Sequence, residues 1–134
     1  MAKLLADSSA LLALVDRDDR HHATARAFLS RQPRHRFVVS ELIVAEVATR
    51  LRARGDADRA VRFANSLLEP GGRYDVVLID IELLRAALDR MLRLRDKRLS
   101  LTDCASFELI DRLRLSGAFT FDRDFRDCGY EMVP

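Results

Sequence analysis

Four acidic residues stand where their carboxylates could meet, although they are far apart in the chain. Asp7 and Asp122 each follow a short apolar run that predicts a buried strand. Asp103 heads the apolar stripe of a predicted helix, and Glu46 lies at the edge of the apolar face of another. Like charges gathered at one place repel unless a cation lies among them. Oxygen ligands without His or Cys partners favour magnesium or manganese over zinc, so the pattern predicts a divalent metal site.

Each acid also has an ordinary structural explanation. Asp7 can cap the helix that follows it, and Asp103 can favour the positive end of its own helix. Asp122 can form a turn, and Glu46 can pair with Arg50 four residues further on. These explanations account for the acids singly, whereas the metal site accounts for all of them together.

Strands and helices alternate along the sequence. Apolar and β-branched runs predict strands at residues 3–6, 37–39, 75–79 and 118–121, with a fifth candidate at 130–133. Helical spacing and capping residues predict helices at 8–15, 20–31, 41–54, 56–68 and 80–95, and a last helix from residue 100 or 102 to 115 that Gly117 ends.

This alternation predicts an α/β domain with a parallel sheet of four or five strands and helices on both faces. In such open sheets, sites form beyond the carboxyl ends of the strands. Asp7 and Asp122 both follow predicted strands, so we expect them to be neighbours in space.

Composition favours one ordinary globular unit. The 134 residues are 49% hydrophobic and 33% charged, with a net charge of +2, which predicts a single domain over residues 1–134. No apolar run approaches the roughly 20 residues that a membrane helix needs, so we expect a cytoplasmic protein. Two isolated cysteines are too few for a disulfide framework or a zinc site.

Four segments together resemble a known family. ADSSALLALVD, SELIVAEVATR, LTDCASF and FTFDRDF, in this order, resemble the PIN-domain nucleases, and in particular the VapC-type toxins of toxin–antitoxin pairs. The resemblance implies a PIN-like, Rossmann-like fold. It also assigns the catalytic and metal-binding acids to Asp7, Glu46, Asp103 and Asp122, with Asp124 as an additional candidate because the last acid of the family varies between these two places. Ser9 and Thr120 match supporting positions beside the site.

The resemblance implies an activity and its partners. It implies an endoribonuclease that hydrolyses RNA phosphodiester bonds with one or two Mg²⁺ or Mn²⁺ ions. It further implies a homodimer and a cognate VapB-type antitoxin that neutralises the toxin. Arg50, Arg54, Arg95 and Arg98 are candidates to contact RNA phosphates, although each also fits a solvated helix face or loop.

The three histidines are not needed as acid–base groups in this chemistry. We expect His21, His22 and His35 to serve surface or packing roles, because none lies near a predicted strand end that could host the site.

Other functions fit less well. A catalytically silent PIN-like module that binds RNA or protein is the main alternative, and the presence of all four acids argues against it. A phosphoacceptor receiver domain would need a lysine near the last strand, and the only lysines are Lys3 and Lys97. A haloacid-type phosphatase would need an aspartate where Ser9 stands.

Overall fold

Five parallel strands form the centre of the molecule. The computed structural model describes residues 3–134. The strands are β1 (Leu4–Ala6), β2 (Phe37–Ser40), β3 (Tyr74–Val77), β4 (Gly117–Phe119) and β5 (Met132–Val133). They lie in the order β3-β2-β1-β4-β5. All neighbouring pairs are parallel, which confirms the predicted parallel sheet, and β1 lies in the middle.

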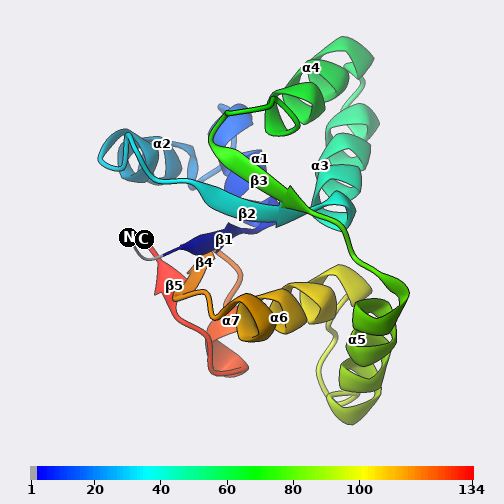
Figure 1. Ribbon diagram of the computed structural model, residues 1–134. Coiled ribbons are helices and arrows are strands. Elements are labelled where there is room, and N and C mark those ends of the chain that lie inside the picture. The colour runs from blue at the N-terminus through cyan, green and yellow to red at the C-terminus, as the bar shows by residue number, and fades with distance from the viewer. Residues whose placement is uncertain (1–2) are drawn as a thin grey trace.

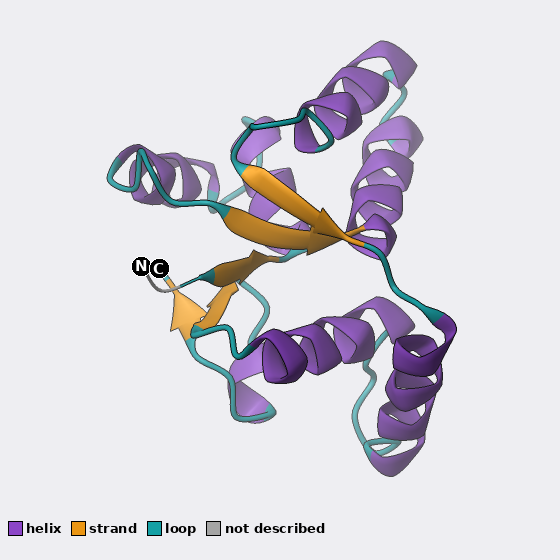
Figure 2. Ribbon diagram, viewed as in Figure 1, coloured by secondary structure: helices purple, strands orange, loops and turns teal. Residues whose placement is uncertain are grey.

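Helices cover both sides of this sheet. They are α1 (Ser8–Val15), α2 (His22–Ser30), α3 (Glu41–Ala53), α4 (Ala57–Leu67), α5 (Ile81–Arg93), α6 (Leu101–Leu113) and α7 (Asp124–Asp127). Figure 1 shows α1 to α4 on one side of the sheet and α5 to α7 on the other. Figure 2 shows strands and helices alternating along the chain, with short loops between most of them. The predicted α/β class with helices on both faces is therefore confirmed.

Side-chain caps fix where the main helices begin. Ser40, Asp56 and Asp80 each accept a hydrogen bond from the backbone N–H three residues on, and they precede α3, α4 and α5. Ser100 and Asp103 form a reciprocal capping box at the start of α6. These caps are local signals, so the helix starts could be predicted from the sequence.

Several details differ from the sequence prediction. Strand β4 ends at Phe119 rather than at residue 121, and β5 covers only Met132–Val133. Strand β3 spans Tyr74–Val77 rather than 75–79, because Leu78 and Ile79 already lead out of the sheet toward α5. The short helix α7 was not predicted. Gly117 does not end α6: Arg114, at φ 52°, is the residue in the left-handed conformation, and Gly117 opens β4.

The core lies on both faces of the central strands. Every residue of β1, β2 and β4 is buried. Aromatic rings fill much of the space between sheet and helices, and Phe37, Phe107, Phe119 and Phe125 are fully buried. The rigid middle of the sheet therefore ends at residues 7, 41 and 120, where the predicted site should lie.

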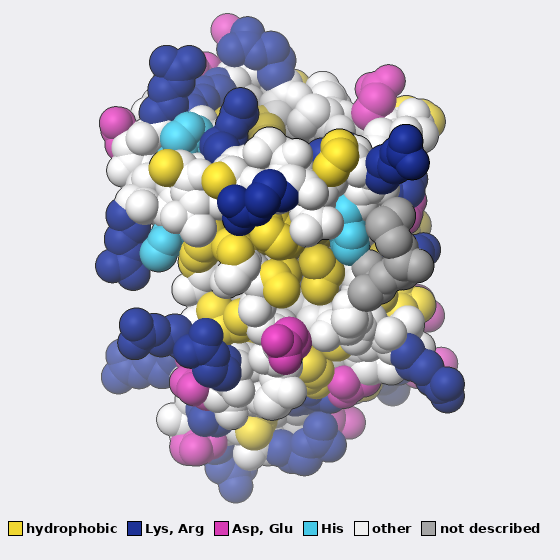
Figure 3. Space-filling view, turned by 90° about the vertical axis from the view of Figure 1, so that its left-hand side faces the viewer, with side chains coloured by type: hydrophobic (Ala, Val, Ile, Leu, Met, Phe, Trp, Pro, Cys, Tyr) yellow, Lys and Arg dark blue, Asp and Glu magenta, His cyan; other side chains and the backbone are white. Residues whose placement is uncertain are grey.

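The surface is strongly charged. On the face shown in Figure 3, hydrophobic side chains gather near the middle, with lysine and arginine side chains around them. Within residues 3–134, no helix is both long enough and apolar enough to cross a bilayer.

Candidate active site

Asp7 is a buried carboxylate at the carboxyl end of the central strand. It follows β1, caps α1 and is only 2% exposed. Its Oδ2 accepts hydrogen bonds from Ser9 Oγ at 2.8 Å and from Thr120 Oγ1 at 2.9 Å. The side-chain donors Ser9 and Thr120 thus both bind Oδ2 rather than Oδ1.

The pKa of Asp7 is raised above its ordinary value. Burial is the main cause, since it disfavours the charged form. The hydroxyl donors of Ser9 and Thr120 oppose this shift, while the negative charge of Asp122 adds to it. The two acids are close because Thr120 Oγ1 contacts both the Asp7 carboxylate and the Asp122 N–H, as their places after two neighbouring strands predicted.

Thr120 joins the ends of these strands. It is fully buried, and its Oγ1 accepts a hydrogen bond from the backbone N–H of Asp122 at 3.0 Å while donating to Asp7. Its Oγ1 also lies 3.1 Å from Ser9 Oγ, which accepts the Phe121 N–H at 3.0 Å. One hydroxyl pair therefore holds Asp7 and the Asp122 segment in a fixed relation.

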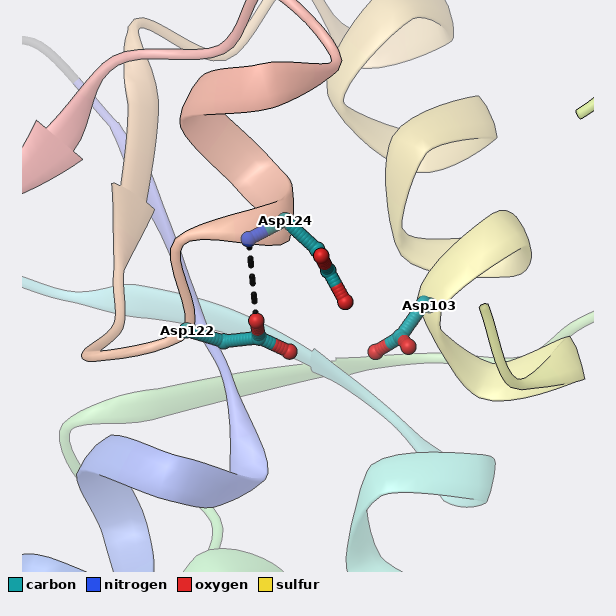
Figure 4. A group of neighbouring side chains, drawn as sticks. All are labelled: Asp103, Asp122 and Asp124. Carbon is teal, nitrogen blue, oxygen red and sulfur yellow. Dashed lines mark hydrogen bonds between the residues drawn. The ribbon is translucent and has the colours of Figure 1, made fainter. Parts of the chain in front are cut away.

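Three further carboxylates converge beside Asp7. Each of Asp103, Asp122 and Asp124 has a carboxylate oxygen within 4.8 Å of the others. Figure 4 shows the three side chains pointing toward one another. Asp122 Oδ1 accepts a hydrogen bond from the Asp124 N–H at 2.9 Å, which fixes the turn into α7. Both candidates for the last acid thus face the same space.

The acids of this cluster disfavour one another's charged forms. Burial raises the pKa of Asp103, and the charges of Asp7 and Asp122 raise it further, although hydrogen bonds with Ser100 lower it. The pKa of Asp124 is raised by burial and by Asp122 and is lowered by Lys97. Unbalanced negative charge is therefore concentrated at this edge of the sheet.

Glu46 lies outside this group of three in the structure. Its side chain is 21% exposed, and its Oε1 pairs with Arg50 at 2.7 Å one turn along α3. This is the helical ion pair that the sequence offered as the ordinary explanation of Glu46.

The donor set fits a hard divalent cation. The cluster presents only carboxylate oxygens from Asp103, Asp122 and Asp124, and Asp7 adds a buried carboxylate whose Oδ1 receives neither of the two hydroxyl donors. Oxygen ligands of this kind suit Mg²⁺ and Mn²⁺. A bound cation would also offset the mutual repulsion that raises the pKa values of these acids.

A pocket opens next to the acid cluster. It has a volume of about 350 Å³ and is lined by Ser9, Leu12, Asp19, Arg20, His21, Arg50, Arg54, Phe121 and Asp122. Of the four predicted RNA-contacting arginines, Arg50 and Arg54 line it, whereas Arg95 and Arg98 are exposed outside it. The Arg50 and Arg54 side chains also pair with Glu46 and Asp16.

The expectation that His21 lies away from the site is wrong. His21 stacks on Phe121 and lines the same pocket as Asp122. It comes there because the loop of residues 16–21 lies beside α1, a tertiary placement that no local pattern encodes. The other two histidines do serve packing roles: His22 Nδ1 lies 2.7 Å from the Ala13 carbonyl oxygen, and His35 is buried against Phe37.

Comparison with solved structures shows which proteins have a similar fold. The structure of Mycobacterium tuberculosis VapC20, described as a sarcin–ricin loop cleaving toxin, matches with a TM-score of 0.88 at 25% sequence identity. The match covers 97% of this chain and 98% of that one. A toxin–antitoxin complex from Klebsiella pneumoniae matches with a TM-score of 0.67 at 15% identity, over 98% and 96% of the two chains. The predicted resemblance to VapC-type toxins is therefore confirmed over nearly the whole chain.

Sequence comparison gives the family. No curated protein matches the chain significantly. The family model of the PIN domain, however, matches residues 4–129, a span that contains every acid of the cluster. The chain therefore belongs to the PIN domain family.

Proposed function

We propose that this protein is a metal-dependent endoribonuclease that acts as a VapC-type toxin. The observation that carries this proposal is the convergence of Asp103, Asp122 and Asp124 within 4.8 Å, with the buried Asp7 beside them. A second support is the full-length similarity to VapC20, whose described activity is the cleavage of RNA.

Asp7, Asp103 and Asp122 would hold the metal, with Asp124 as a further ligand. Glu46 would join them by exchanging its ion pair with Arg50 for the metal. A bound divalent cation lowers the pKa of water and neutralises the charge that develops on a phosphoryl group during hydrolysis. The carboxylates must be ionised to bind the cation, so the affinity for the metal should decrease as the pH is lowered.

The remaining residues of the site orient these acids and the substrate. Ser9 and Thr120 would keep Asp7 Oδ1 turned to the metal by holding Oδ2. Arg50 and Arg54 lie in the pocket beside Asp122 and would bind RNA phosphates on either side of the cut. Arg95 and Arg98 would act further out, as exposed charges that attract RNA over a longer range.

The sarcin–ricin loop is the RNA to test first. VapC20 is described as cleaving it, and the two chains correspond over nearly their full lengths. We propose that this chain cleaves a structured ribosomal RNA of the same kind.

The main experiment uses purified protein, an RNA containing the sarcin–ricin loop, and total RNA. We expect discrete fragments with Mn²⁺ or Mg²⁺, and intact RNA with EDTA or with the Asp103→Asn variant. A matched control is Asp89→Asn, since Asp89 is exposed on α5 and is not one of the clustered acids. Intact RNA in every reaction, with RNA still bound, would favour the catalytically silent module.

We also propose an antitoxin partner. The support is the structural similarity to the toxin–antitoxin complex from Klebsiella pneumoniae. A VapB-type antitoxin would neutralise this protein by covering the pocket and the acid cluster. Adding the purified candidate antitoxin to the cleavage reaction should abolish fragments at a stoichiometric ratio.

A homodimer is the proposed assembly. Apolar side chains of Ile81, Leu88 and Leu92 recur at helical spacing on α5 and are 66%, 47% and 61% exposed. Such a stripe is typical of a helix that packs on a partner. Leu88→Glu should therefore convert a dimer to a monomer in analytical ultracentrifugation, whereas Asp89→Asn should not.

A further inference from the structure

Two rings form a flat stack at the edge of the acid cluster. The imidazole of His21 lies on the ring of Phe121, with centroids 4.2 Å apart and planes inclined by only 3°. Both residues line the 350 Å³ pocket that also contains Asp122. Phe121 covers one face of the imidazole, and the stacked pair forms part of the pocket wall.

This stack is anchored in the hydrophobic core. The Phe121 ring lies 6.3 Å from that of Phe119 in an edge contact. Phe119 is fully buried and packs against Phe28 at 4.8 Å and Phe37 at 5.5 Å. The platform is therefore held by a continuous set of aromatic contacts and is ordered before any ligand arrives.

The platform is also tied to the acids by hydrogen bonds. The Phe121 N–H donates to Ser9 Oγ at 3.0 Å, and the same hydroxyl donates to Asp7 Oδ2 at 2.8 Å. Asp122 follows Phe121 directly. A group stacked on the rings is therefore held at a fixed place relative to a phosphate at the acids.

Side chains of both charges surround the rings, since Asp19 and Asp122 line the pocket together with three arginines. Arg20 donates through Nε to His21 Nε2 at 3.1 Å, and Arg50 and Arg54 line the other parts of the pocket. Arg50 pairs with Glu46 and Arg54 with Asp16, whereas Arg20 takes part in none of the ion pairs formed by residues 3–134. Its guanidinium is therefore available to an anion next to the platform.

We infer that the His21–Phe121 pair is a nucleobase platform, on which the base of a nucleotide flanking the cut stacks while Arg20 binds the phosphate of that nucleotide. The inference rests on the proposed ribonuclease function and adds residues that position the substrate. A planar surface beside a cationic side chain is the combination that binds unpaired nucleotides. An apolar ligand would not need Arg20, and a lone phosphate would not need the rings.

The test measures binding without cleavage. Protein carrying Asp103→Asn is titrated, by fluorescence anisotropy, into a short labelled single-stranded RNA and into RNAs with one abasic residue at successive positions. His21→Ala should weaken binding to the intact RNA by about 5- to 100-fold, since loss of one stacked base has an effect of that order. At one abasic position, the same substitution should have no effect.

Further variants separate stacking from simple packing. His21→Phe should restore binding to within about twofold, whereas His21→Leu should not, because leucine fills space without a flat ring. Arg20→Ala should weaken binding to intact and abasic RNAs alike. It should also reduce the salt dependence of the binding constant by about one phosphate contact. The matched controls are His22→Ala and Arg62→Ala, since neither residue lines this pocket.

The outcomes distinguish this inference from the proposed function. Equal binding by His21→Ala and its parent, or equal weakening by His21→Phe and His21→Ala, overturns the platform. Cleavage by wild-type protein with Mn²⁺ is measured in parallel. Cleavage without a His21 effect rejects only the platform, whereas a His21 effect without cleavage rejects only the endoribonuclease. If neither the parent protein nor its variants bind RNA, the platform is also rejected.

Discussion

Thr120 has a larger role than a supporting hydroxyl. Its Oγ1 donates to the buried Asp7 carboxylate and accepts the Asp122 N–H, and the side chain has no exposed surface. Both partners belong to the acid site, so the stability of the strand end and the geometry of the site depend on the same atom.

Thr120→Val should lower the free energy of unfolding by about 1–3 kcal/mol. Valine has nearly the same shape, but it leaves the Asp7 carboxylate short of a donor and the Asp122 N–H without its acceptor. Urea denaturation measures the change. Thr120→Ser, which keeps the hydroxyl, should lose less than half as much, and Thr24→Val on the exposed face of α2 should lose almost nothing. Equal stability of Thr120→Val and wild type would show that the hydrogen bonds are not needed.

Asp103→Asn should stabilise the metal-free protein at neutral pH. The pKa of Asp103 is raised in the folded state by burial and by Asp7 and Asp122. The folded state therefore binds this proton more tightly than the unfolded chain, and the resulting stability is lost as pH rises from the ordinary value of 3.8 through the raised pKa. Asparagine carries no charge, so it avoids this loss.

Thermal melts in EDTA between pH 4 and pH 7 measure this effect. The advantage of Asp103→Asn should be small at the acid end and grow toward neutral pH, because the like charges of Asp7 and Asp122 then act on an ionised Asp103. Asp89→Asn should show no such trend. A variant that melts below wild type by the same amount at every pH would indicate damage to the capping box instead.

At the scale of elements, Arg90 connects three segments. From α5 its Nε donates to Glu108 at 3.0 Å and its Nη2 donates to Asp111 at 2.7 Å, both on α6. Its Nη1 donates to the hydroxyl of Tyr130 at 2.6 Å, just before β5. The Arg90 and Glu108 side chains are only 15% and 14% exposed, so this pair holds the α5–α6 hairpin in a largely dry environment.

Arg90→Met should destabilise the protein by about 2–4 kcal/mol. Methionine preserves much of the apolar stem but leaves the Glu108 carboxylate without its partner. Chemical denaturation gives the difference, and Arg93→Met on the exposed side of the same helix is the control. If both variants unfold at the same denaturant concentration, the Arg90 network contributes nothing to stability.

Gly117→Ala should weaken the pairing of the edge strand β5 with β4. An added Cβ would lie 2.6 Å from the Glu131 carbonyl oxygen, a distance that requires the backbone of β4 or of the β5 segment to move. We expect a loss of about 1–3 kcal/mol. Hydrogen exchange should accelerate at the Thr120 N–H, which donates to Val133, but not at the Phe37 N–H, which donates to Arg73 at the other side of the sheet. Unchanged exchange at Thr120 would contradict the expectation.

Local signals explain which elements could be predicted. The caps Ser40, Asp56, Asp80 and Ser100 act within a few residues, so the sequence was sufficient to place those helix starts. The parallel direction of the strands followed from the alternation of strands and helices, whereas their order in the sheet was not predicted. Gly117 was misplaced because its small size is required by Glu131, which lies fourteen positions away in the chain and across a strand pair.

The acid cluster was predictable for a related reason, and the pocket was not. Carboxyl ends of neighbouring parallel strands must meet, so Asp7 and Asp122 could be paired from the sequence. His21 belongs to a loop whose path along α1 depends on packing between distant segments. Its stacking on Phe121 therefore had no sequence signal.

At the scale of the whole molecule, a divalent cation should act as a stabilising ligand. Mn²⁺ at 100 times its dissociation constant should add about 2.7 kcal/mol to the free energy of unfolding, because it binds the folded state alone. Differential scanning fluorimetry of wild-type protein should show the rise in melting temperature. Asp122→Asn should abolish most of it and Asp89→Asn should not. An equal rise in melting temperature for Asp122→Asn would show that the metal binds elsewhere than at the acid cluster.

The strand order has a consequence for the synthesis of this protein. Strand β1 is made first, yet its neighbour β4 follows more than a hundred residues later and brings Thr120 and Asp122 with it. A nascent chain that has completed α1 to α6 still lacks the segment that closes the acid site. Thr120 and Asp122 reach Asp7 only when β4 has paired with β1, so a chain that has folded through α6 without β4 cannot assemble the acid site.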